Sequence, residues 1–478
     1  MTEAYLIIDS SSGSIRAAVF SSDGKLLSLA ARDINNKVDA AYPNALYFDF
    51  PEYNKLLISV CREAVLSAPG AKITAVSAAS QREGIVLINK NGNAVIGLPN
   101  IDNRGLEFEN GIEKKHRSYL LGGRWVSTLF PAVKLIGLRE RRPDIYEQMS
   151  TFTSISDYIA YYFTGKLAYE ISQACETLLL DIKKCQWSEE LCERFEIPIS
   201  CLPELIKCGT LLGFVKGQLC EEIGIHTRVP FYVGGADTQL AAEACLPGAN
   251  EMVIVAGTTT PIVCLRNGYV EDEQERCWLN RHVRPDIFIV ETNVGVSGIN
   301  YQRAKETFYP GESYEAMEEE LSTCGVPRCI ASVGSMIFGE GRVTPNGGFV
   351  LSSPLDGALE RKDFAYAVLL DYAFSFKNNF ENNVSISGCR PSKILGCGNG
   401  FASKILPQLM ADLIGQEIHI VDGYSHATMV GVYHLLSQKM GNSCCSKRKV
   451  IRTVFPEKNS PLTEYYDKWM NIRTLFNP

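Results

Sequence analysis

Apolar runs separated by short polar turns dominate the first hundred residues of the chain. Residues 5–9 and 15–20 are nearly continuous apolar runs, which predict two buried strands joined by a polar turn. Asp23-Gly24 is typical of a hairpin turn and predicts a third strand after it. Pro51 begins a segment whose apolar residues recur at helical spacing, and residues 73–79 predict the next strand. The pattern indicates strands and helices in alternation from the start.

The middle of the chain has a different pattern. Residues 133–222 are mostly helical in pattern, with breaks at Gly165 and Pro203. Strand-like residues 229–233 follow, and a helix-like segment covers residues 240–245.

The pattern of the first strands returns after residue 250. Residues 251–255 predict an apolar strand, residues 256–260 a small polar turn, and residues 262–265 a returning strand. This echo of residues 5–20 indicates a duplicated fold with two facing loops. Four later elements are predicted, a strand, a helix, a strand and a helix, at residues 393–395, 402–414, 417–421 and 426–437. Beyond about residue 440 we expect a helical or partly ordered appendage without chemistry.

Composition narrows the class of protein. The 478 residues are 46% hydrophobic and 21% charged, with a net charge of -7, so a large core is expected and nucleic acid is not expected as a partner. Sixteen cysteines occur without C-x-x-C pairs, which indicates core thiols in a reducing compartment and no zinc site. Because no secretory leader or membrane-length apolar run is seen, we predict a cytoplasmic protein without a membrane partner.

Two loops carry a carboxylate at a predicted strand end. Gly234-Gly235-Ala236-Asp237 follows a strand and precedes a helix, so Asp237 is placed to remove a proton from a bound hydroxyl. The alternative is a tight turn with an aspartate at the helix N-terminus. In residues 9–16, backbone N–H groups and hydroxyls predict an anion site, and Asp9 beside them is a candidate Mg²⁺ ligand. An ordinary polar hairpin is the alternative there.

Three further loops offer polar groups. Gln81, Arg82 and Glu83 follow a strand and suit a polyhydroxylated ligand, with Asp102 nearby in the chain, although a surface charge pair is the alternative. The loops at 257–259 and 396–400 are candidates for phosphates and a nucleotide, or else plain turns. The second of these also approaches a dinucleotide fingerprint, but Phe401 stands where its third glycine belongs, and no Walker loop occurs.

In this order the loops resemble those of the FGGY carbohydrate kinases of the actin/hexokinase-like superfamily, over roughly residues 4–440. The matching segments correspond to the family's first phosphate loop, sugar motif, Asn/Asp-x-Arg turn, catalytic loop, second phosphate loop, adenosine loop and closing helix: Asp9–Arg16, Gln81–Gly84, Asp102–Arg104, Gly234–Gln239, Gly257–Thr259, Gly396–Ser403 and His426–Gly431. Within the family, residues 77–87 are most similar to autoinducer-2 kinases.

The resemblance implies two ribonuclease-H-like α/β domains with a cleft between them, residues 1–247 for the sugar and 248–478 for the nucleotide. The implied reaction transfers the γ-phosphoryl group of ATP to a hydroxyl of a small sugar, or of 4,5-dihydroxy-2,3-pentanedione. Asp237 would take the proton and Asp9 would organise Mg²⁺. The implied nucleotide residues are Ser12, Gly13, Ser14, Arg16, Gly257, Thr258, Gly398 and Asn399, and the implied sugar residues are Gln81, Arg82, Glu83 and Asp102.

Four departures from the family pattern keep alternatives open. Ser11 and Ala236 replace glycines, Gly137 stands where tryptophan is frequent, and His426 replaces glutamate. A catalytically weak, sugar-responsive binding protein is therefore one alternative. A xylulose or glycerol kinase is a second, and a dinucleotide enzyme is a third. A homodimer is left open as the assembly.

Overall fold

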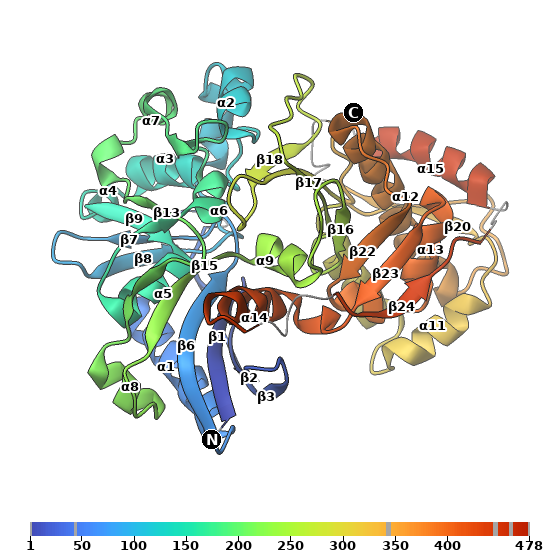
Figure 1. Cartoon of the computed structure of the whole chain (residues 1–478). Helices are drawn as coiled ribbons and strands as arrows, with labels where there is room; N and C mark the ends of the chain where they lie inside the picture. Colours follow the sequence, from blue (N-terminus) through green and yellow to red (C-terminus); the bar gives the residue numbers. More distant parts are fainter. Residues whose placement is uncertain (1, 43–44, 341–345, 443–447, 458–461, 477–478) are drawn as a thin grey trace.

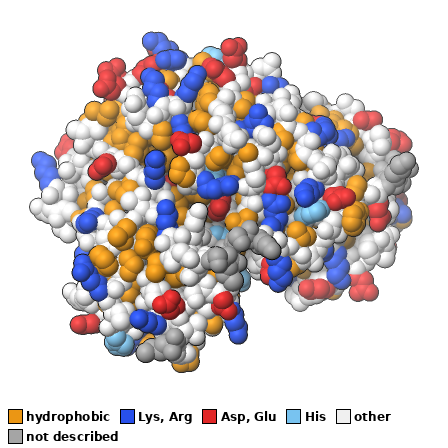
Figure 2. Space-filling view, in the orientation of Figure 1, with side chains coloured by type: hydrophobic (Ala, Val, Ile, Leu, Met, Phe, Trp, Pro, Cys, Tyr) orange, Lys and Arg blue, Asp and Glu red, His pale blue; other side chains and the backbone are white. Residues whose placement is uncertain are grey.

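Two mixed β-sheets of related topology organise the chain, one in each lobe of the molecule (Figure 1). The structure is a computed structural model and describes residues 2–42, 45–340, 346–442, 448–457 and 462–476. Among these residues, no helix combines the length and the hydropathy that crossing a membrane requires. On the face shown in Figure 2, cationic and anionic side chains are scattered among apolar ones.

The first sheet has six strands. Its order is β14 (Leu211–Phe214), β15 (Pro230–Ala236), β6 (Ala71–Ser80), β1 (Thr2–Ser10), β2 (Ser14–Ser21) and β3 (Leu26–Asp33). β1, β2 and β3 form an antiparallel meander, as the sequence predicts, whereas β1 runs parallel to β6 and β6 runs parallel to β15. Three parallel strands therefore end at one edge of the sheet.

The second sheet has seven strands and repeats this arrangement. Its order is β18 (Trp278–Arg281), β19 (Phe288–Asn293), β17 (Pro261–Arg266), β16 (Met252–Val255), β22 (Lys393–Cys397), β23 (Glu417–Val421) and β24 (Val450–Val454). β16, β17 and β19 are antiparallel neighbours, with β18 on the outer side of β19, and β16, β22 and β23 are parallel. The predicted duplication of the fold is confirmed. Residues 247 and 248 follow β15 and precede β16 in the chain, and a domain boundary there stays a prediction.

Helices cover both sheets. α1 begins as predicted, with Asp49 accepting the backbone N–H of Glu52 at 3.1 Å and Pro51 in its first turn. The 27-residue α12 of the second lobe was not predicted. The longer helices are α1 (Phe50–Leu66), α2 (Lys115–Gly122), α3 (Pro131–Arg141), α5 (Ile155–Thr164), α10 (Ser297–Phe308), α11 (Tyr314–Ser322), α12 (Arg361–Ser387), α13 (Ile405–Ile414) and α15 (Leu462–Phe476); shorter ones are α4 (Pro143–Tyr146), α6 (Ile171–Ala174), α7 (Glu189–Phe195) and α8 (Gly217–Ile223).

Two sequence expectations need correction. Residues 133–222 are not mostly helical, because they contain β14 and also β9 (Thr151–Ser154), which pairs with β7 (Ile85–Ile88). Strands of four residues are too short to show a clear period in the sequence. The segment after residue 440 is also more than an appendage, since Trp469 of α15 is fully buried and its indole N–H donates to Asp371 at 2.9 Å.

Helices α9 and α14 have equivalent positions in the two lobes, and each packs against the sheet of the other lobe. α9 (Asp237–Ala244) follows β15 of the first sheet, but Ala241 and Ala242 pack against β16, β17 and β22 of the second. α14 (Ala427–Lys439) follows β23 of the second sheet, but Met429 and Val432 pack against β1, β2 and β6 of the first. Figure 1 shows both helices in the middle of the molecule, between the sheets. The lobes are thus held together by this pair of helices.

Backbone contact between α9 and α14 depends on one glycine. A Cβ atom at Gly431 would lie 1.8 Å from the carbonyl oxygen of Leu240, which no side chain can tolerate without movement of a backbone. We expect Gly431→Ala to lower the free energy of unfolding by about 1–3 kcal/mol through overpacking, measured by urea denaturation. Gly217→Ala is the matched control because a Cβ there meets no atom within 4 Å.

The control substitution should leave stability unchanged or raise it by up to about 1 kcal/mol, since alanine favours helix over glycine. Equal effects of the two changes would contradict a tight crossing at Gly431.

Candidate active site

Three of the predicted loops meet at the carboxyl edge of the first sheet. In the register of the parallel strands, Ser10 lies opposite Ser80 and Ala236 lies opposite the same residue. The loop after β1, the loop after β6 and the first turn of α9 therefore begin side by side. The sheet topology thus brings Asp9, Arg82 and Asp237 to the same edge of the sheet, where their side chains can act on one ligand.

The loop after β1 is stabilised by its own serines. Ser11 donates its hydroxyl to the carbonyl of Ser14 at 3.1 Å and accepts the Ser14 N–H at 3.3 Å, so its side chain folds into the turn. Ser12 is partly exposed and Gly13 is exposed, with free space around the glycine Cα. The serine that replaces a family glycine is thus accommodated by the loop and leaves its outer side open.

The carboxylate of Asp9 is 1% exposed and forms an ion pair with Arg16 across the β1–β2 hairpin. Among the described residues, no group of three His, Cys, Asp or Glu side chains could hold a metal ion alone. Mg²⁺ commonly takes only one or two carboxylates and completes its shell with phosphate oxygens and water. Asp9 therefore fits a cation that arrives with phosphates, and it does not fit a protein-only metal site.

Gln81 is a bridge between loops. Its amide N–H donates to the carbonyl of Ser11 at 3.1 Å, and its amide oxygen accepts the backbone N–H of Asn100 at 2.9 Å. The residue is only 1% exposed. Although the sequence predicts a sugar contact here, the structure places Gln81 as the link between the first phosphate loop and the turn at residue 100.

Asp102 also supports the backbone in this structure. Its two carboxylate oxygens accept the N–H of Leu46 at 2.8 Å and the Nε–H of Arg104 at 2.7 Å, and it is fully buried. The sequence-predicted sugar residue is therefore not an open group of the loop cluster. Close packing of the neighbouring backbone also explains Gly137, since a Cβ there would lie 2.4 Å from the amide nitrogen of Gly105.

Arg82 lies at the centre of a buried ion-pair network. Its Nη1 is 2.7 Å from Glu291 of β19 and 3.7 Å from Glu176, and its Nε is 3.8 Å from Glu83. Arg124 is 2.6 Å from Glu176, and its guanidinium lies 4.9 Å from the centre of the Trp278 ring. Burial opposes the charge of Arg82, but the three carboxylates outweigh it and hold its pKa above the usual value.

Glu83 is held in an unusual state beside this network. Its backbone is left-handed, with φ of 60°, which is uncommon for a residue other than glycine and is found at functional sites. Burial raises the pKa of its carboxyl to about 8, although the charge of Arg82 acts against the shift. Near neutral pH the group is therefore largely protonated and able to donate a hydrogen bond.

Sequence reasoning missed Arg124, Glu176 and Glu291. Each is a lone charge in a largely apolar neighbourhood, such as Glu291 within the strand Phe288–Asn293, and each is at most 1% exposed. A lone charged residue within an apolar segment is the sequence signal that indicates such a buried ion pair, because charged side chains are rarely buried without a partner.

Asp237 is the first residue of α9. Gly234 lets β15 approach β6, because a Cβ there would lie 1.8 Å from the carbonyl of Ala78. The N–H of Ala236 donates to the hydroxyl of Ser172 at 3.0 Å, and the Asp237 carboxylate accepts the N–H of Thr238 at 2.6 Å. Burial raises the pKa of Asp237 to about 6, opposed by Arg82 and helped by Asp9. The carboxyl is thus poised to accept a proton near neutral pH.

The two glycine loops of the second half are joined. The N–H of Gly400 donates to the carbonyl of Ala256 at 2.8 Å, and Gly398, with φ of +98°, leaves only 2.3 Å between its absent Cβ and the same oxygen. Gly257, Thr258 and Asn399 are exposed on this pair of loops. The N–H groups of Gly257, Gly398 and Gly400 donate to backbone carbonyls, so the open surface that could meet phosphates or a nucleotide is that of the exposed residues.

The start of α14 connects the two sets of loops. The hydroxyl of Thr428 donates to the carbonyl of Asp237 at 3.5 Å. Burial lowers the pKa of His426, with the charge of Arg16 adding to this shift and Asp9 opposing it. Its Nδ1 is buried with no hydrogen-bond partner among the described residues. The helix that replaces the family glutamate with histidine therefore begins beside Asp9 and Asp237.

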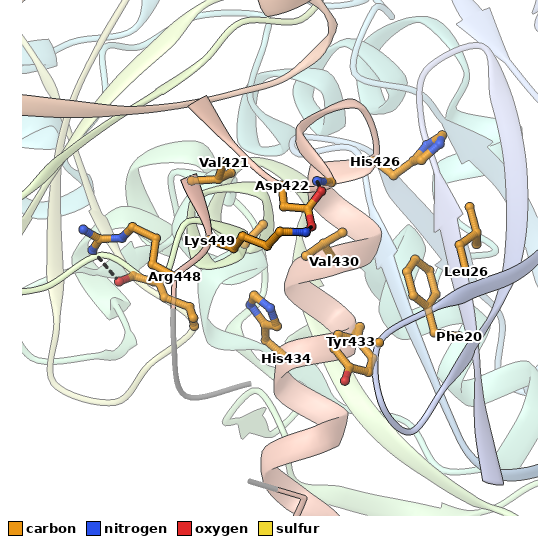
Figure 3. A pocket seen from close by; sticks show the side chains of 14 residues that line it. Phe20, Leu26, Val421, Asp422, His426, Val430, Tyr433, His434, Arg448 and Lys449 are labelled. Carbon is orange, nitrogen blue, oxygen red and sulfur yellow. Dashed lines mark hydrogen bonds and ion pairs between the residues drawn. The ribbon is translucent and has the colours of Figure 1, made fainter. Parts of the chain in front are cut away.

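A separate cavity of about 250 Å³ lies along the side of α14 (Figure 3). Phe20 and Tyr433 line its apolar wall, whereas Lys449 is ion-paired to Asp422 at 2.6 Å. Neither Arg82 nor Asp237 reaches it, so it is not the place where the predicted chemistry gathers.

Comparison with known proteins agrees with this geometry. Residues 4–243 match the model of the FGGY family of carbohydrate kinases, N-terminal domain. "Putative sugar kinase YoaC" of Bacillus subtilis (strain 168) is 37% identical, with 99% of this chain and 98% of that protein covered. The autoinducer-2 kinase of Escherichia coli O9:H4 (strain HS) is 27% identical, with 98% and 94% covered.

Solved structures show the same fold at low identity. The ligand-bound xylulose kinase of Lactobacillus acidophilus has a TM-score of 0.88 at 16% identity, covering 99% of this chain and 98% of the other. Plasmodium falciparum glycerol kinase with ADP has a TM-score of 0.85 at 17% identity, again covering 99% and 98%. The predicted two-domain, actin-like α/β fold class is confirmed.

The buried pair of Arg124 and Glu176 provides a test of the network. Arg124→Met should lower the free energy of unfolding by about 3–5 kcal/mol, because it removes the nearer of the two guanidinium groups that pair with the buried Glu176. Chemical denaturation measures the change. Adding Glu176→Gln should recover part of the loss, since the two sites are coupled.

The control is Arg117→Met, which removes a bidentate ion pair with Glu190. The side chain of Arg117 is 52% exposed and that of Glu190 is 42% exposed. An exposed pair contributes only about 0–1 kcal/mol. Similar losses for Arg117→Met and Arg124→Met would argue against a dry network at this site.

Proposed function

The chain belongs to the FGGY family of carbohydrate kinases, and we propose that its acceptor is a short, oxygen-rich molecule, with 4,5-dihydroxy-2,3-pentanedione as the first candidate. Membership makes the protein an ATP-dependent sugar phosphotransferase. The observation that supports the site is the meeting of Asp237 with Arg82 and Glu83, between loops that suit phosphates.

Asp237 is proposed as the general base. It lies at the N-terminus of α9 with a pKa raised to about 6, so at neutral pH it is mostly ionised yet basic enough to take a hydroxyl proton. Phosphoryl transfer has a loose transition state, so positioning and charge neutralisation supply most of the catalysis. Arg82 and Glu83 are proposed to hold the acceptor beside Asp237.

The nucleotide side is proposed to use both lobes. Ser12, Gly13, Ser14 and Arg16 from the first lobe and Gly257 and Thr258 from the second are proposed to bind phosphates, with Gly398 and Asn399 at the adenosine end. Asp9 is proposed to hold Mg²⁺, which when bound neutralises the charge of the phosphates. A cytoplasmic location and a homodimer stay predictions, and light scattering in solution tests the second.

Two alternatives lose support. Ser11 and Ala236, which replace family glycines, do not favour a weak binding protein, because the Ser11 side chain folds into its own turn and the Ala236 methyl is fully buried. The loop at 396–400 does not favour a dinucleotide enzyme, because Phe401 is 1% exposed beneath it and its ring would be 2.7 Å from a Cβ at Gly396. The aromatic ring fills the space under the loop.

Rates as a function of pH test the base. Because Asp237 must be ionised, kcat/KM should fall on the acidic side of its pKa of about 6, about tenfold per pH unit, and stay constant from there to about pH 8, where Glu83 loses its proton. Asp237→Asn should lower kcat by about 10²–10⁴ while ATP binding, measured by calorimetry, stays near the wild-type value. Near wild-type turnover by the folded Asn variant would remove Asp237 from this role.

The acceptor is tested by an ADP-release assay with the dione, xylulose and glycerol. We expect the highest kcat/KM for 4,5-dihydroxy-2,3-pentanedione, because residues 77–87 are most similar to autoinducer-2 kinases, and glycerol is the second candidate. Arg82→Ala should raise KM or abolish turnover by removing a charged donor. A higher kcat/KM for xylulose than for the dione, or unchanged values in Arg82→Ala, would refute the assignment.

A further inference from the structure

The acceptor region contains more carboxylates than guanidinium groups. Arg82 and Arg124 are the two cations of the network, and Glu83, Glu176 and Glu291 lie against them at 2.6–3.8 Å. Asp237 interacts electrostatically with Arg82 and Glu176 and adds another carboxylate. Even with Glu83 protonated, the carboxylates of Glu176, Glu291 and Asp237 outnumber the two guanidinium groups, so the positive charge of Arg82 is already matched before any ligand arrives.

Glu291 is the residue of this set that the second lobe contributes. It is fully buried on β19, where Asn293 Nδ2 lies 3.4 Å from its Oε1 and Asn280 Nδ2 lies 3.5 Å from its Oε2. Trp278 is its partner on β18, and the Trp278 ring centre lies 6.0 Å from the Arg82 guanidinium. The carboxylate is therefore fixed in place by its own sheet and reaches Arg82 across the junction of the lobes.

Arg82 still has donors for a ligand. Its Nη1 is used by Glu291, but Nη2 and Nε make no hydrogen bond to the residues that the structure describes. A hydroxyl or carbonyl oxygen can accept from these nitrogens without bringing charge. A carboxylate or phosphate on the ligand would instead meet Glu291 and Glu176 at close range, and like charges in a buried site disfavour binding strongly.

We propose that Glu291, together with Glu176, restricts the acceptor to uncharged sugars by neutralising Arg82 and repelling sugar acids and sugar phosphates. This inference rests on the proposed kinase function and concerns the same site. Glu291 is a specificity-determining residue in this view, supplied by the lobe that is otherwise assigned to the nucleotide.

The test compares uncharged and anionic acceptors of similar size. ADP release is measured with xylulose and the dione on one side and with xylonate and gluconate on the other. The wild-type protein should show kcat/KM at least about tenfold higher for the uncharged set, and the difference should lie mainly in KM. Glu291→Gln should reduce this ratio about tenfold, since it releases the positive charge of Arg82.

Glu251→Gln is the matched control, because it removes a glutamate that pairs with Arg448 in the same lobe, away from the acceptor. It should leave the ratio unchanged. If Glu291→Gln does not fold cooperatively, Glu176→Gln replaces it with the same expectation. A structural role alone would lower the rates for both acceptor classes equally, and that result would overturn the inference.

The outcomes also separate the inference from the function on which it rests. A wild-type preference for xylonate or gluconate over the uncharged acceptors would overturn the inference and leave the kinase function intact. No turnover with any acceptor would overturn both.

Discussion

The crossing of α9 and α14 is the constraint on which the rest of the molecule depends. Each helix follows the last parallel strand of one sheet and packs on the other sheet, and their backbones touch where Gly431 meets Leu240. Because Asp237 begins α9 and His426 precedes α14, this single contact also places the proposed base beside the first phosphate loop. Packing and catalysis therefore share one geometric requirement.

Burying charge at this junction has a cost that only mutual pairing offsets. An isolated ion in the interior would shift its pKa and neutralise, and Glu83 illustrates this with a pKa near 8. Arg82 stays charged because carboxylates from both lobes surround it. The same balance leaves Asp237 only moderately shifted, to about 6, which is the range where a base works at neutral pH.

Features set by neighbouring residues, such as strands and their loops, could be predicted from the sequence. Contacts between residues far apart in the chain could not. The loops at Asp9, Arg82 and Asp237 follow short apolar strands, so the pattern and the turn residues locate them in the chain. Their meeting at one sheet edge depends on the parallel pairing of β1, β6 and β15. Glu291 joins the site only through a pairing 209 positions away, which no local period records. The polarity of Gln81 and Asp102 predicts sugar contacts, whereas their backbone partners lie far along the chain, and contact with a sugar stays a prediction for both.

The packing of α14 on the first sheet has a consequence for folding during synthesis, because α14 is synthesised long after that sheet. A ribosome adding about 5–20 residues per second needs about 10–40 s to pass from Arg82 to Glu291, and longer to reach α14. During that interval the face of the first sheet formed by Tyr5, Ile7 and Phe20 has been synthesised without the helix that covers it. The first lobe therefore keeps this apolar face uncovered until residues 427–439, which form α14, have been synthesised.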